Sequence, residues 1–336
     1  MASDLRRMLR RPPSKHNGTV IEVRGVTKRF KDTLAVDDLS FEVKPGQVTG
    51  FLGPNGSGKS TTMRIIMGLD SPDAGFATVN GRRYHDLPLP LREVGALLEA
   101  RAIHPGRSAV NHLWYLARSN DIPRARVFEV LEMVGLEKVG RKRAGKFSLG
   151  MGQRLGIAAA LLGDPGVLLF DEPVNGLDPE GILWVRNLLK GLAVEGRTIF
   201  VSSHLMSEMA LTADQLVVIG KGRLISAGST SEFISESSSQ FVRVRSPHAD
   251  RLEELLVAEG AVVRKEADGA LAVSALSAPD IGDVAGTNGI FLHELSTQSA
   301  SLEEAFMELT RESVEFHGEA LLTPSGRAST ESTEER

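Results

Sequence analysis

Residues 53–60 read GPNGSGKS and stand between an apolar strand-like run, QVTGFLG, and a helical pattern, STTMRIIMGLD. This spacing matches G-x-x-x-x-G-K-[ST], in which glycines let backbone N–H groups point inward while the helix N-terminus attracts anions. We predict that Lys59 reaches the β- and γ-phosphates of a nucleotide and that the Ser60 hydroxyl ligates Mg²⁺. A glycine turn with a purely structural role is less favoured, because the strand–turn–helix context is complete. The predicted nucleotide-binding residues here are Gly53, Pro54, Asn55, Gly56, Ser57, Gly58, Lys59, Ser60 and Thr61.

Strand-like and helical segments alternate through residues 19–234. TVIEVRGVTKRF and LSFEVKPG alternate in polarity, as half-buried strands do, whereas QVTGFLG, VLLFDEP and TIFVSSH contain the continuous apolar runs of buried parallel strands. A mostly helical stretch, about residues 96–162, interrupts this order. The pattern predicts an α/β core with a parallel sheet and an inserted helical subdomain.

A second, smaller unit is predicted over residues 235–312, after the linker-like ESSSQ. Its segments follow the order strand, helix, strand, strand, helix, strand, which is that of a ferredoxin-like α+β domain. SLEEAFMELT is expected to close this unit as a helix, with Ser301 as N-cap and Glu304 completing a capping box. No catalytic group of residues is recognised within it, and a dimer-stabilising or regulatory role is the simplest expectation.

The amino-acid composition argues against several classes of partner and chemistry. The 39 basic and 43 acidic residues leave a net charge of −4, so no nucleic-acid partner is expected. The absence of cysteine excludes disulfides, thiolate chemistry and cysteine-ligated zinc. No run approaches the roughly 18 apolar residues of a membrane span.

The two ends of the chain are predicted to lie outside the folded units. Residues 1–18 form a basic arm without the apolar region of a secretory signal, and a weak contact with anionic lipid is the less favoured interpretation. Residues 313–336 are rich in Ser, Thr and Glu and are predicted to be a disordered tail.

Two carboxylates and a histidine follow the later apolar strands. Asp171 and Glu172 end VLLFDEP, and His204 ends TIFVSSH. Ligands of open α/β sheets bind at the carboxyl ends of the strands, where these residues meet. We expect Asp171 to hold Mg²⁺, directly or through water. Glu172 points to the opposite side and is the candidate base that polarises the attacking water. A single histidine at a strand end more often has a purely structural role. His204 is predicted to be a site residue because it occurs together with the phosphate loop and the two carboxylates.

Taken together, the motifs of about residues 19–230 resemble those of the nucleotide-binding subunit of ABC transporters. The resemblance implies an ABC-type phosphate-loop core with an additional antiparallel β subdomain. NGLDP is similar to the D-loop, so Asp178 would touch a second subunit, and SSH is similar to the switch that places His204 at the γ-phosphate. Phe30 stands where family members stack an aromatic ring on adenine. Glu99 occupies the Q-loop position, where many relatives carry glutamine; it could ligate Mg²⁺ or orient water but cannot donate a hydrogen bond while ionised.

FSLGMGQR resembles the family signature LSGGQ-x-Q-R and begins another apolar helical run. Ser148, Gly150 and Gln153 match the signature, whereas Leu149 and Met151 depart from it. The form SLGM is typical of a branch similar to the bacitracin, daunorubicin and lantibiotic-immunity exporters. The resemblance implies that this turn, at a helix N-terminus, binds the γ-phosphate of ATP held by a second chain.

The implied function is an ATP-hydrolysing subunit with ATP as substrate and Mg²⁺ as cofactor. Two copies would close head to tail around two ATP molecules and drive a separate integral-membrane permease from the cytoplasmic face of the membrane. Drug or antibiotic export is the favoured process, with lipid or ion export and a soluble, non-transport ABC ATPase as alternatives. A phosphate-loop kinase would leave the SLGM turn, NGLDP and His204 unexplained.

Overall fold

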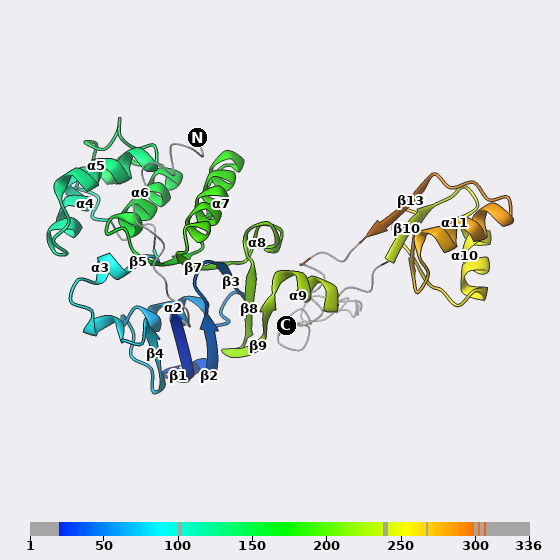
Figure 1. The fold of residues 1–336 in the computed structure, drawn as a ribbon, viewed down its shortest axis with the longest axis horizontal. Coiled ribbons are helices and arrows are strands. Elements are labelled where there is room, and N and C mark those ends of the chain that lie inside the picture. Colours follow the sequence, from blue (N-terminus) through cyan, green and yellow to red (C-terminus); the bar gives the residue numbers. More distant parts are fainter. Residues whose placement is uncertain are drawn as a thin grey trace, which may run out of the picture.

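The protein is represented by a computed structural model that describes residues 20–99, 103–237, 241–266, 268–298, 302 and 306. The predicted arm and tail, at residues 1–18 and 313–336, lie outside these ranges. The strands form three sheets, two in the larger unit and one in the C-terminal module (Figure 1).

A six-stranded sheet forms the centre of the larger unit. Its strands, in spatial order, are β5 (Val94–Leu97), β6 (Val167–Asp171), β7 (Thr198–Ser203), β3 (Val48–Leu52), β8 (Gln215–Gly220) and β9 (Arg223–Ser229). All neighbours pair in parallel except β8 and β9, which form an antiparallel hairpin. Strands β3 and β7 are buried along their whole length, which explains their continuous apolar runs. The predicted parallel core is confirmed.

An antiparallel sheet in the order β2-β1-β4 packs against this centre. Its strands are β1 (Ile21–Phe30), β2 (Thr33–Val43) and β4 (Ala74–Val79). The rings of Phe41, Phe51 and Phe200 lie with centroids 5.0 to 5.5 Å apart and join β2 to β3 and β7. Helix α2 (Lys59–Ile66) shares this apolar cluster through Met63, which places its N-terminus beside the end of β3.

The inserted subdomain is helical but begins later than predicted, because Val94–Leu97 form β5 of the central sheet. Its helices are α4 (Ala109–Arg118), α5 (Arg124–Met133) and α6 (Leu149–Leu161). The described part of the larger unit also contains helices α3 (Pro90–Glu93), α7 (Pro179–Val194), α8 (Met206–Thr212) and α9 (Thr230–Ser237), with short 3-10 turns η1 (Tyr84–Asp86) and η2 (Ala144–Lys146).

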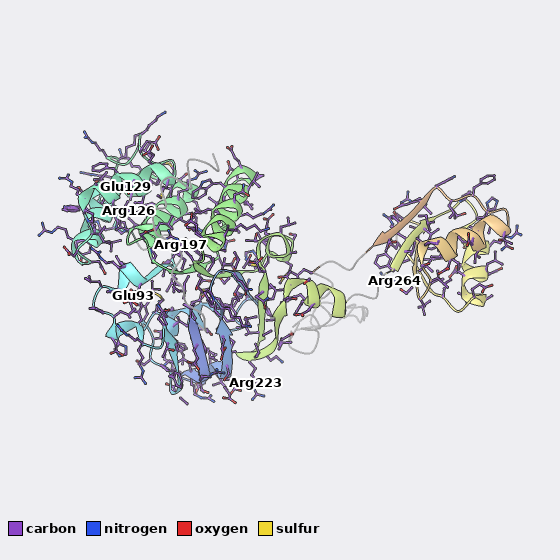
Figure 2. The ribbon with its side chains drawn as sticks, in the orientation of Figure 1. Glu93, Arg126, Glu129, Arg197, Arg223 and Arg264 are labelled. Carbon is purple, nitrogen blue, oxygen red and sulfur yellow. The ribbon has the colours of Figure 1, made fainter. Side chains whose placement is uncertain are left out.

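Arginine side chains hold helix α6 in place. Arg126 of α5, labelled in Figure 2, donates to the carbonyls of Leu161 and Leu162 at the end of α6, at 3.1 and 3.4 Å. Arg154, on α6 itself, donates to the Val134 carbonyl at 3.2 Å. Cations that bind the last carbonyls of a helix also complement its dipole. Helix α6 is therefore anchored within its own subdomain.

The C-terminal module has the predicted ferredoxin-like order of elements. They are β10 (Phe241–Arg245), α10 (Ala249–Ala258), β11 (Val262–Lys265), β12 (Leu271–Ser274), α11 (Ala278–Thr287) and β13 (Glu294–Gln298). The four strands form an antiparallel sheet in the order β11-β12-β10-β13. Val242, Leu252 and Ile281 belong to the apolar cluster of this module, which is separate from the clusters of the larger unit.

The segment SLEEAFMELT differs from its predicted role. Leu302 and Phe306 are 2% and 5% exposed, and both belong to the main apolar cluster of the larger unit, together with Phe233 of α9. The chain thus returns from the C-terminal module to the larger unit instead of closing the module. Ser301 and Glu304, the predicted capping pair, lie outside the described residues.

Candidate nucleotide site and signature turn

The phosphate loop connects β3 to α2 and depends on its glycines. Gly58 caps α2 with φ of 102°, and a Cβ there would lie 2.4 Å from the Ala35 carbonyl oxygen. Gly56 also has a positive φ, of 79°. Side chains disfavour such backbone angles, and the approach to Ala35 leaves no room for one. The backbone of the loop therefore favours glycine at both positions, and at Gly58 it excludes any side chain.

Lys59 is buried at this helix N-terminus. Its side chain is 7% exposed, and Nζ donates to the carbonyls of Gly53 and Pro54 at 2.6 and 3.2 Å. Burial lowers the pKa of Lys59, while the nearby carboxylates of Glu172 and Asp171 oppose this shift. A buried ammonium held by loop carbonyls is a suitable partner for phosphate oxygens.

An open pocket of about 350 Å³ lies over the loop. It brings together residues of the phosphate loop, of the turn after β6 and of the end of β7. Its lining residues are Ala35, Asn55, Gly56, Gly58, Lys59, Ser60, Thr61, Glu172, Asn175 and His204. The structure thus joins the predicted phosphate loop to the predicted base and histidine. Sequence reasoning missed Ala35 and Asn175, although Asn175 begins the quoted NGLDP.

A second cavity lies among α7, α8 and β7 and is lined by Val185, Leu189 and Met209 among others. Its volume is about 20 Å³, room for roughly one water molecule. It is too small for a nucleotide.

The two carboxylates stand where β6 ends. Asp171 is the last residue of the strand, and Glu172 follows it with φ of 50°, a left-handed conformation that is rare for glutamate. The hydroxyl of Ser202, on the neighbouring strand β7, donates to Asp171 and accepts the backbone N–H of Glu172 at 3.0 Å. Ser202 is 0% exposed; the sequence analysis quoted it within SSH but assigned it no role of its own.

Glu172 and His204 form a pair at the pocket. Nδ1 of His204 lies 2.8 Å from Oε2 of Glu172. The Glu172 side chain is 21% exposed and that of His204 is 43% exposed, so water can reach both. A carboxylate held by an imidazole beside a phosphate loop can orient a water molecule and take its proton.

The signature turn faces outward from the same chain. Ser148 caps α6 by accepting the N–H of Met151 at 3.3 Å, and Ser148 and Leu149 are exposed. Leu149 packs on the NGLDP turn: a Cβ at Gly176 would lie 2.0 Å from Leu149 Cδ2. Among the described residues, those lining the nucleotide pocket include none from this turn.

Gln153 is buried, whereas Ser148 and Leu149 of the signature turn are exposed. Its side chain is 3% exposed, and Nε2 donates to the carbonyl of Glu172 at 3.0 Å. The structure therefore places Gln153 against the candidate base of its own chain and not on an outer surface.

Three further predicted site residues do not line the pocket. Phe30, at the end of β1, is 45% exposed, and Lys28 Nζ lies 5.3 Å from its ring centroid. Asp178 caps α7 by accepting the N–H of Gly181 at 2.9 Å. Glu99 is exposed beyond the end of β5.

Comparisons with known proteins agree with these features. The model of the ABC transporter family matches residues 36–175, and that of a domain of unknown function matches residues 240–303. An uncharacterized ABC transporter ATP-binding protein, YhcH of Bacillus subtilis, is 35% identical over 302 residues, covering 88% of this chain and 98% of that protein. The bacitracin transport ATP-binding protein BcrA of Bacillus licheniformis is 41% identical over 210 residues, covering 62% and 69%.

Solved structures show the same fold. The ATP-binding subunit of an ABC transporter aligns with a TM-score of 0.60 and 27% identity, over 65% of this chain and 93% of that one. A dimeric bacterial ABC transporter cassette aligns with a TM-score of 0.59 and 25% identity, over 62% and 98%. These comparisons confirm the predicted family and cassette fold. The chain belongs to the ATP-binding proteins of ABC transporters, and it is the subunit that binds and hydrolyses ATP.

Proposed function

We propose that the protein is the energy-supplying subunit of an exporter, in which two copies close head to tail around two ATP molecules. The observation that carries this proposal is the separation of two features within one chain. The pocket holds Lys59, Glu172 and His204, whereas the capped and exposed N-terminus of α6 is not part of its lining. Such a helix end attracts anions, and the γ-phosphate of a second chain's ATP would satisfy it.

The residues of the pocket suit Mg²⁺-ATP. Ser60 lines the pocket and Asp171 is the last residue of the adjacent strand β6; the hydroxyl of the first and the carboxylate of the second would hold the ion. The buried hydroxyl of Ser57 in the same loop has no hydrogen-bond partner among the described residues, as suits a loop built for a ligand. Bound Mg²⁺ would neutralise charge that develops on the phosphate oxygens.

Hydrolysis then uses the Glu172–His204 pair. Glu172 orients a water molecule and accepts its proton as the water oxygen bonds to the γ-phosphorus. The bond between the γ-phosphorus and the oxygen bridging it to the β-phosphate breaks, leaving ADP and inorganic phosphate. His204 holds the Glu172 carboxylate and contacts the γ-phosphate. Loss of the γ-phosphate removes the ligand that joins the two chains, so the dimer opens.

The membrane partner is proposed to be a separate permease, which would hold this subunit at the cytoplasmic face of the membrane. None of the described helices combines the length and apolar character needed to cross a bilayer. Drug or antibiotic export is supported by the SLGM turn and by the similarity to the bacitracin transport protein. A relative named for Nod factor export, from Burkholderia orbicola, is 34% identical over 304 residues, which supports export and the alternative of a cargo other than a drug.

Glu172→Gln tests this proposal. We expect ATP to bind with unchanged affinity, hydrolysis to fall about 100- to 1,000-fold because the base is lost, and a closed dimer to accumulate in Mg²⁺-ATP. Turnover and light scattering during size-exclusion chromatography measure the two effects. Glu180→Gln, in the first turn of α7, is the matched control and should retain turnover. Turnover of Glu172→Gln at the wild-type rate would exclude it as the base, and a variant that stays monomeric would contradict the ATP-closed dimer.

A further inference from the structure

We propose that Gln153 is a positioning residue for Glu172, so that helix α6 serves both ATP sites of the closed dimer. The inference rests on the proposed function and adds a connection within one chain. Gln153 stands on α6 five residues after the Ser148 cap, and Nε2 donates to the Glu172 carbonyl at 3.0 Å. The orientation of the amide is determined by this contact, because a flipped amide would bring two oxygens together.

Glu172 needs such support. Its φ of 50° lies in a region that glutamate rarely occupies. Hydrogen bonds hold the residue on both sides: its N–H donates to Ser202 at 3.0 Å, and its carbonyl accepts from Gln153 at 3.0 Å and from the Asn175 N–H at 3.2 Å. Gln153 and Ser202 are both buried, so water does not compete for these bonds. Together they hold the backbone that aims the carboxylate at His204.

The same helix carries the outward-facing signature turn. Ser148 and Gln153 are joined by less than two turns of α6, whose backbone hydrogen bonds make it a stiff unit. A shift of the helix N-terminus when the partner's ATP binds would therefore move the Gln153 amide against the Glu172 carbonyl. The base of one site would thus respond to the ATP bound at the other.

The test compares two variants with different expected signatures. Gln153→Leu removes the donor at similar volume, and we expect ATP affinity within twofold of wild type with turnover reduced at least tenfold. Because the signature turn is intact, this variant should still close and should accumulate as an ATP-bound dimer, like Glu172→Gln. Gln215→Leu is the matched control: it makes the same exchange at a half-buried position on β8, away from Glu172 and from α6, and it should keep turnover near wild type.

Two results would overturn the inference. Wild-type turnover of Gln153→Leu would show that the contact does not position the base. Slow turnover without dimer closure would place Gln153 at the partner's ATP, as for other signature residues. If Gln153→Leu melts at a lower temperature than wild type, Gln153→Met is judged by the same two outcomes. Failure of the proposed function is distinguishable, because wild type would then lack turnover and Glu172→Gln would not close.

Discussion

The phosphate loop and the signature turn are both glycine-rich, and both lead into a helix, yet they are built differently. In the phosphate loop, Gly56 and Gly58 have positive φ and Lys59 is buried beneath the pocket. The signature turn has an ordinary serine cap, no lysine at the corresponding place, and exposed residues at its tip. A glycine-rich turn at a helix N-terminus is therefore not sufficient by itself to form a phosphate site. The first turn has a buried cation and adjoining strands of its own, whereas under the proposed function the second is completed by the ATP of another chain.

The largest expected effect is that of Lys59→Ala, which removes the cation that distinguishes the two turns. We expect turnover to fall about 1,000-fold, because the charge-assisted contacts with the β- and γ-phosphates are lost. ATP affinity of the single chain should fall as well, which a fluorescent nucleotide titration measures. Retention of ATP binding would show that the loop backbone alone suffices and would remove the main contrast with the signature turn.

Ser148→Arg tests the other half of the comparison. A long cation at the exposed cap should block the partner's ATP, so we expect dimer turnover to fall roughly 100-fold while ATP binding by the single chain is unchanged. Mixed dimers with the variant in one chain measure the trans effect. If both of their sites keep full turnover, the signature turn does not act on the partner's ATP.

Two glycine substitutions test whether the phosphate loop and the signature turn differ in their backbone requirements. Gly58→Ala would strain a φ of 102° and drive Cβ against the Ala35 carbonyl, costing about 1 to 3 kcal/mol and weakening ATP binding roughly tenfold. In Gly150→Ala, Cβ would lie 3.3 Å from Leu177, a contact that a small side-chain shift relieves. Calorimetric titration with ATP compares them, and equal losses would contradict the different backbone requirements.

The smallest effect is expected for Leu149→Gly, which restores the glycine of the family signature. The leucine is 45% exposed and packs on Gly176, and glycine weakens the first turn of α6. We expect a loss of about 1 kcal/mol in the free energy of unfolding, measured in urea, with turnover within threefold of wild type. A much larger loss of turnover would show that Leu149 is required for the link between signature turn and D-loop.

Much of the architecture follows from local sequence. Continuous apolar runs predicted the buried parallel strands, and strict spacing predicted the phosphate loop, because both are consequences of chain geometry over fewer than ten residues. The same reasoning failed at SLEEAFMELT. Its apolar face predicts burial, but a repeating pattern cannot say which cluster buries it, and Leu302 and Phe306 lie with the larger unit. Asn175 and Ser202 were missed because their roles depend on residues elsewhere in the chain.

The sequence by itself determined the residue types: a lysine after a glycine loop, two carboxylates at a strand end and a serine-capped turn before an apolar helix. The tertiary structure determined which of these residues contact one another. The parallel pairing of β6 and β7 brings Ser202 to Asp171 and Glu172, and the packing of α6 buries Gln153 against the Glu172 carbonyl. The physical reason is that the spacing of residues along the chain determines only local geometry, while a hydrogen bond between residues 19, 30 or 31 positions apart forms only where folding places donor and acceptor within about 3 Å.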